Sequence, residues 1–116
     1  MGTDTTLRAE PRTPREERAY ATNDLNAIRA SLMAELEKVR DRLNVGTRDE
    51  ALRKADEERA AELAQGLERV DRALAAIGAE NDTTWVAMRT SHLKEVDEVR
   101  AWMREHRRDE ASASVR

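Results

Sequence analysis

The residues of this sequence best suited to chemistry are its two histidines. His92 and His106 stand 14 residues apart, close to one face of a helix but about 21 Å apart along its axis at 1.5 Å per residue. One chain therefore cannot hold a metal ion with both. The Glu-x-x-His pair of di-iron bundles is absent too, because Arg89 and Met103 stand three residues before the histidines. We expect no metal ion or cofactor, and a His92 that is packed and hydrogen-bonded.

The carboxylates do not suggest an active site either. Glu57, Glu58 and Glu62 lie among basic residues on a face that we expect to be solvated. No serine, histidine and acid combination has a distinctive spacing, and no glycine-rich loop cradles a phosphate. Small helical enzymes such as the helical chorismate mutases hold a dianionic substrate with several inward cations, whereas Arg29 and Arg40 have no convergent partners here. We therefore expect no enzymatic activity.

The apolar residues of the segment 83–108 point to protein binding instead. At 100° per residue they span an arc of about 200°, twice the minimum for a core-facing stripe. Tryptophan and methionine are enriched at the cores of protein interfaces, so we predict a surface for a partner or a second copy of the chain. Its residues would be Met88, Val99, Trp102, Met103 and His106. The alternative is that the other helices wrap this one asymmetrically and leave Trp102 half exposed.

The end of the chain is locally basic. Net charge is −3 overall, but residues 100–116 carry five basic and three acidic side chains, or +2. Cations also stabilise a helix C-terminus through the helix dipole, which is the interpretation we favour. The alternative is contact with a polyanion such as nucleic acid. The residues concerned are Arg100, Arg104, Arg107 and Arg108.

The composition predicts long helices. Charged residues make up 39% of the chain and aromatic residues 3%, as in helical bundles and coiled coils. The absence of cysteine excludes disulfides and thiolate metal sites. There is no apolar run of about 18 residues and no signal-like leader, so we expect a cytoplasmic protein without a membrane partner.

Three helices are predicted, at about 14–44, 48–77 and 83–108. Thr13 and Glu16 form a capping box around the first, and Gly46 suits the left-handed residue that ends it. Thr47 with Glu50 forms a second capping box, and Asn81 or Asp82 caps the third helix. The first helix has inward residues at steps of three and four. These are Ala21, Leu25, Ile28, Leu32, Leu36, Val39 and Leu43.

The second helix has two unlike halves. Its inward residues are Leu52, Leu63, Leu67, Val70, Leu74 and Ile77, so Leu52 is the only large aliphatic residue of 48–62. That half carries a ladder of opposite charges spaced i to i+4. Short loops then give an antiparallel, up-down-up three-helix bundle with coiled-coil-like packing. We expect residues 1–12 to form a disordered lead and residues 109–116 a frayed tail.

The hairpin of the first two helices resembles the coiled-coil part of DksA-type regulators, which enter RNA polymerase. The likeness rests on acidic residues past its tip, Asp49, Glu50, Asp56, Glu57 and Glu58, and on the closing phrase 67–77. Most of those regulators continue into a cysteine zinc finger, whereas this chain has a third helix there. The resemblance covers about 60 residues and implies a transcription-accessory role.

These observations predict a non-enzymatic interaction or scaffold module, typical of a small bacterial or phage protein. We expect a homo-oligomer that binds a protein partner through the third helix. The alternatives are a nucleic-acid-associated, transcription or packaging factor that uses the acidic hairpin or the basic end, and a bundle that binds a small ligand or metal.

Overall fold

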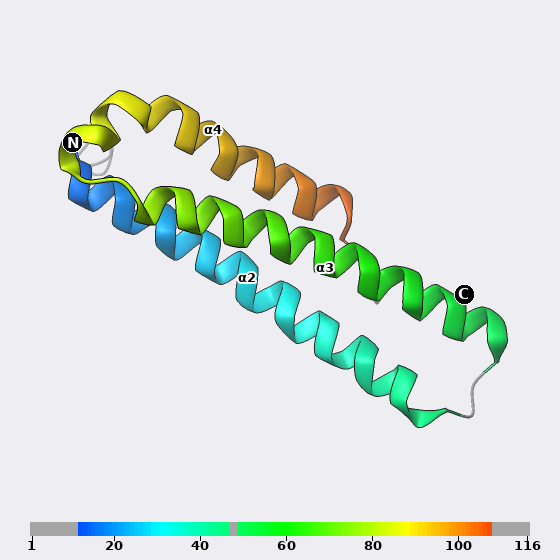
Figure 1. Ribbon diagram of the computed structural model, residues 1–116. Helices are drawn as coiled ribbons and strands as arrows, with labels where there is room; N and C mark the ends of the chain where they lie inside the picture. The colour runs from blue at the N-terminus through cyan, green and yellow to red at the C-terminus, as the bar shows by residue number, and fades with distance from the viewer. Residues whose placement is uncertain (1–11, 47–48, 108–116) are drawn as a thin grey trace, which may run out of the picture.

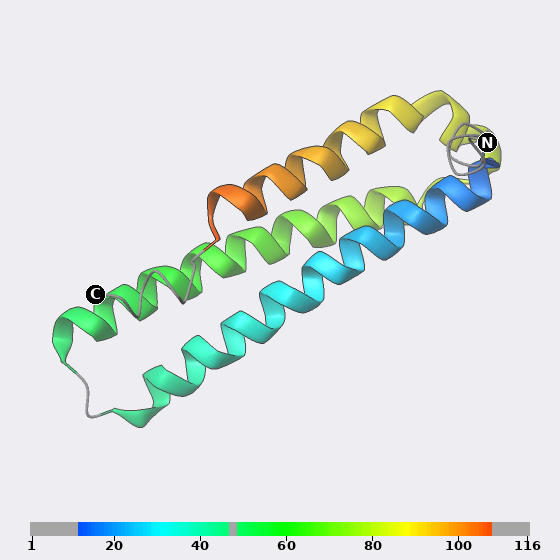
Figure 2. The ribbon, with the colours of Figure 1, turned by 180° about the vertical axis from the view of Figure 1, so that it is seen from behind.

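A computed structural model describes residues 12–46 and 49–107 of the chain. It has three helices, α2 (Pro14–Val45), α3 (Glu50–Gly78) and α4 (Asp82–Glu105). They lie side by side in antiparallel, up-down-up order (Figures 1 and 2), and each contacts the other two. No strand occurs within those two ranges. The predicted three-helix bundle is thus confirmed, while the expectations for the lead and the tail concern residues outside the described ones, except Arg12.

The helix ends follow the capping residues closely. Thr13 and Glu16 form the expected capping box, and Gly46 ends α2 in the left-handed conformation with φ 81°. The start of α3 differs from the prediction, because Asp49 is the N-cap and accepts a hydrogen bond from the backbone N–H of Ala51 at 2.7 Å. Thr47 lies outside the described residues.

The third helix is shorter than predicted. Asn81 caps its start in a capping box with Thr84. It ends at Glu105, three residues before the expected end, and His106 is its C-cap. No helix of the described chain is both long enough and apolar enough to cross a lipid bilayer.

The core contains nearly all the inward residues that the sequence predicts for α2. Six of its seven residues are buried, and Leu43 packs against them partly exposed. From α3 come Leu63, Leu67, Val70, Ala73 and Ile77, and from α4 come Trp85, Val96 and Val99. The expectation for Leu52 was wrong, because its side chain is 55% exposed, and Val86 of α4 is 65% exposed as well.

The difference in helix length leaves part of the hairpin uncovered. α4 stops where the carbonyl oxygen of its C-cap, His106, accepts a hydrogen bond from Arg59 Nη1 at 2.6 Å. Beyond that level α2 and α3 continue as a pair, as both ribbon views show (Figures 1 and 2). We call this pair, residues 36–46 and 49–58, the arm. The nine α3 residues before Arg59 make it about 14 Å long.

Candidate functional site

The residues predicted to form an interface on α4 do not share one surface. Val99 is 1% exposed and belongs to the core. Trp102 and Met103 are partly buried and pack against the core. Met88 is 45% exposed and stands on the surface. Most of the broad apolar arc of α4 is therefore used inside the bundle.

Trp102, a member of the predicted interface, packs against α3. Its indole lies on Gly66 of α3, so closely that a Cβ atom added to Gly66 would be 2.4 Å from Trp102 Cη2. The His106 ring stacks on the same indole, with its centroid 4.3 Å from that of the indole. The asymmetric wrapping considered as the alternative accounts for this part of α4.

His92 is packed and hydrogen-bonded, as expected. Its ring stacks on Trp85 with the centroids 5.3 Å apart, and its Nε2 contacts Glu80. The His92 hydrogen bond lowers the pKa of Glu80 below its ordinary value of 4.5, and a hydrogen bond from Thr84 lowers it further. Within the described residues no three histidine or acidic side chains are grouped as metal ligands would be.

The basic end is only partly available to a polyanion. Arg100 is engaged by Asp24 and by Asp97, the latter at 3.0 Å. Arg104 and Arg107 are exposed, and Arg108 lies outside the described residues. Among the described members of the set predicted to contact a polyanion, Arg104 and Arg107 have no ion pair.

The sequence analysis missed a buried polar cluster where α4 ends. Arg59 is 8% exposed and donates to Glu35 of α2 at 2.7 Å and also to Glu62. Asp56, also 8% exposed, accepts two hydrogen bonds from Arg42 at 3.0 and 3.2 Å. Glu62, expected on a solvated face, is partly buried beside Arg59, and the burial of Asp56 was not predicted. Arg59 also caps α4 through the His106 carbonyl, so one guanidinium joins all three helices.

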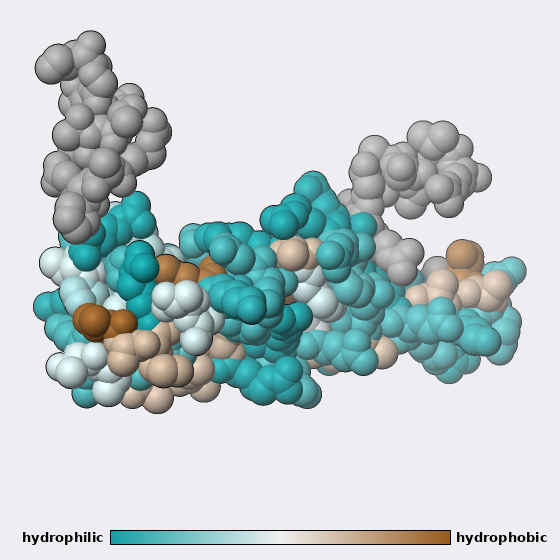
Figure 3. Space-filling view, turned by 90° about the horizontal axis from the view of Figure 1, so that it is seen from above, coloured by the Kyte–Doolittle hydropathy of each residue, from teal (hydrophilic) through white to brown (hydrophobic). Residues whose placement is uncertain are grey.

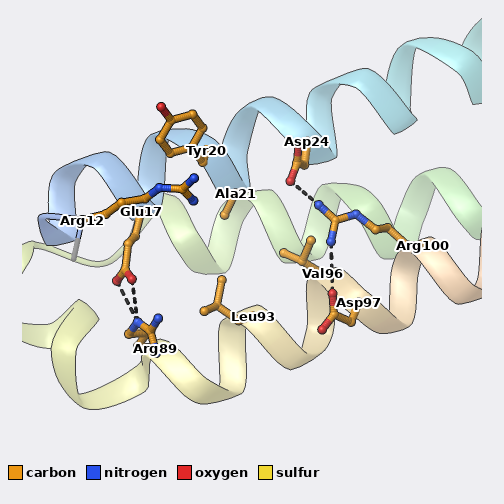
Figure 4. A pocket seen from close by; sticks show the side chains of 10 residues that line it. All are labelled: Arg12, Glu17, Tyr20, Ala21, Asp24, Arg89, Leu93, Val96, Asp97 and Arg100. Carbon is orange, nitrogen blue, oxygen red and sulfur yellow. Dashed lines mark hydrogen bonds and ion pairs between the residues drawn. The ribbon is translucent and has the colours of Figure 1, made fainter. Parts of the chain in front are cut away.

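A pocket of about 270 Å³ opens between α2 and α4 (Figure 4). Its floor is apolar and is formed by Ala21, Leu93 and Val96. Glu17 reaches across to Arg89, whose Nε lies 2.8 Å from each Glu17 oxygen. The hydrogen bond from Trp85 Nε1 and those from Arg89 hold the pKa of Glu17 below its ordinary value, so this carboxylate stays ionised.

The arm offers a different kind of surface. Leu36 and Val39 are buried between its two helices, but Val45 and Leu52 are 63% and 55% exposed near its tip. Seen from the side of α4, the molecule is mostly hydrophilic, with small hydrophobic areas at both ends (Figure 3). α4 does not reach the arm, so no third helix of the described chain covers Val45 and Leu52.

Comparisons with protein-family models, with curated proteins and with solved structures found no match to this chain. Function must therefore be argued from the chain's own surfaces.

Proposed function

We propose that the chain is a non-enzymatic module that binds another protein with the tip of its arm. The observation that carries the proposal is the length difference between the helices, which leaves α2 and α3 projecting past the end of α4. Single exposed apolar residues are ordinary on protein surfaces. Val45, however, is the last residue of α2 and Leu52 is the third residue of α3, so both exposed apolar side chains belong to the end of this projection.

The charges of the arm support contact with a protein rather than with a polyanion. The described part of the arm carries alternating acidic and basic residues, with Arg53 paired to Glu57 at 3.6 Å. Such a surface has no strong field of one sign. An apolar tip surrounded by mixed charges has the anatomy of a small protein interface, with an apolar centre and a polar rim.

Photo-crosslinking in cells of the native host tests this proposal. A benzophenone amino acid at position 52 should crosslink to one partner, and Val45→Glu should weaken that crosslink. The matched control carries the same amino acid at position 86, since Val86 is also exposed, at 65%, but lies on α4. Absence of a crosslink from position 52, or equal crosslinking from positions 52 and 86, would refute binding at the tip.

RNA polymerase is the first partner to test. The resemblance to DksA-type regulators implies it, and a two-helix arm that extends beyond the rest of the domain is the element such a role requires. Purified core polymerase should retain the wild-type chain more strongly than the Leu52→Glu variant. Equal retention would remove this candidate and leave the partner open.

Self-association through α4 is the second candidate. Met88, the exposed member of the predicted interface, favours it. Met88→Lys should then shift the sedimentation of the chain toward the monomer mass of 13.2 kDa. A wild-type chain that already sediments as a monomer at high micromolar concentration would refute self-association.

A further inference from the structure

The pocket between α2 and α4 has opposite net charges at its two ends (Figure 4). At one end lie the guanidinium groups of Arg12 and Arg89 and a single carboxylate, Glu17. At the other end lie the carboxylates of Asp24 and Asp97 and a single guanidinium, Arg100. One end therefore carries an excess positive charge and the other an excess negative charge.

The excess positive charge belongs to Arg12. Both oxygens of Glu17 are within hydrogen-bond distance of Arg89, and one of them also accepts from Trp85. Arg12 makes no ion pair with the described residues and lies over the ring of Tyr20, 4.3 Å from its centroid. In the close-up its guanidinium points toward the pocket above Ala21 (Figure 4). Hydrogen bonds are the main cause that lowers the pKa of Glu16 and of Glu17, and the charge of Arg12 lowers both further. No carboxylate of the described residues forms an ion pair with Arg12, however, so its N–H groups can bind an anion in the pocket.

The excess negative charge lies two helical turns away. Asp24 and Asp97 both contact Arg100, which neutralises only one of them. Glu17 and Asp24 are seven residues apart on α2, so the two ends are separated by about 10 Å at 1.5 Å per residue. Between them the floor offers only apolar side chains, Ala21, Leu93 and Val96.

We propose that this pocket binds a small zwitterion whose carboxylate and ammonium groups are joined by an apolar stem. The carboxylate pairs with Arg12, and the ammonium pairs with Asp24 and Asp97. The stem lies on the apolar floor and excludes water from it. The pocket lies on a face distant from the arm, so a test of ligand binding here does not depend on whether the arm binds a protein.

The probe for this site is 6-aminohexanoate, which has both charges and a stem of methylene groups. Titration of the full chain, followed by amide and methyl chemical shifts, should give saturable shifts at Ala21, Leu93 and Val96. Hexanoate lacks the ammonium and hexylamine lacks the carboxylate. Each should bind at least about tenfold more weakly than 6-aminohexanoate, as expected for the loss of one charged contact.

Two exposed residues allow the charges to be removed without disturbing the core. Arg12→Gln and Asp97→Asn should each weaken 6-aminohexanoate binding about tenfold. The controls are Arg104→Gln and Glu105→Gln, which remove the same charges from exposed positions of α4 outside the pocket and should leave binding unchanged. Unchanged helical circular dichroism of all four variants shows that they fold.

Three results would overturn the proposal. The first is the absence of saturable shifts at the pocket residues. The second is binding of hexanoate or hexylamine as tight as that of 6-aminohexanoate. The third is an equal loss of binding in the pocket and control variants.

Discussion

Replacing Gly66 by alanine should destabilise the bundle, although alanine is the better helix former. In the middle of α3 the exchange alone would stabilise the helix by about 1 kcal/mol. The new Cβ atom, however, would lie 2.4 Å from Cη2 and 2.5 Å from Cζ3 of Trp102. Real Cβ atoms do not approach other atoms so closely, so the indole must move away from α3.

The cost of that movement can be worked from the burial of the indole. Full burial of a tryptophan removes roughly 200 Å² from water, worth about 5 kcal/mol at 25 cal/mol per Å². Trp102 is partly buried, so displacement forfeits about 2–3 kcal/mol of this. After subtraction of the gain in helix propensity, Gly66→Ala should lower the free energy of unfolding by about 1–2 kcal/mol.

Urea unfolding followed by helical circular dichroism measures this change. The midpoint should fall by about 1 M, since small proteins lose about 1–3 kcal/mol of stability per molar urea. Gly78→Ala is the matched control, because a Cβ atom there meets nothing within 4 Å and Gly46 is the only described glycine with positive φ. That control should be neutral or mildly stabilising.

A double-mutant cycle makes the test stricter. In a Trp102→Ala background nothing opposes the new methyl group, so Gly66→Ala should change sign and become stabilising. If Gly66→Ala is at least as stable as the wild type, or destabilises equally in both backgrounds, the indole does not lie on Gly66 and the reasoning fails.

Three further predictions concern the ion pairs and the arm. Arg59→Ala should cost about 2–3 kcal/mol in chemical unfolding, less than the 3–5 typical of a fully buried pair because its carboxylate partners are partly exposed. The hydrogen bond from Arg69 holds the pKa of Glu95 below its ordinary value of 4.5. A carboxylate whose pKa is lower in the folded state contributes stability that is present above about pH 4.5 and is lost as the pH falls through its folded-state pKa. In the Glu95→Gln variant the unfolding midpoint should therefore fall less on acidification than in the wild type. Amide exchange in Glu50–Glu58 should be faster than in Leu63–Ile77, and equal protection would show that the tip of α3 is covered.

Local signals in the sequence were enough to predict the three helices and most of the core. The Thr13 capping box and Gly46 act within a few residues of the helix ends, so spacing alone predicts them. The stripe of α2 repeats at three and four residues because one face of a helix must remain inward. These features need no knowledge of which helix lies opposite.

The errors in packing involve residues that are distant in sequence. Asp56 belongs to the acidic stretch past the tip of the hairpin, but Arg42 of another helix binds it inside the bundle. Nothing near Trp102 in the sequence indicates that Gly66 provides a space for its ring. Leu52 has the right spacing for the core, yet it is exposed because α4 ends before reaching it. Of the candidate sites, the packed state of His92 was predictable, whereas the pocket and the arm were not.

Arg59, whose guanidinium caps α4, marks the boundary between the three-helix region and the arm. The lengths of these two parts can change independently. Everything on one side of Arg59 is fixed by three-helix packing, whereas the arm depends only on the pairing of two helices. Inward residues of α2 recur every 11 residues, close to a whole number of helical turns. Adding one such unit to each helix of the arm would lengthen it by about 16 Å at 1.5 Å per residue and would leave the three-helix region in register. Related chains could therefore differ in reach while they keep the same body, and a partner site at a different depth would require a change in arm length alone.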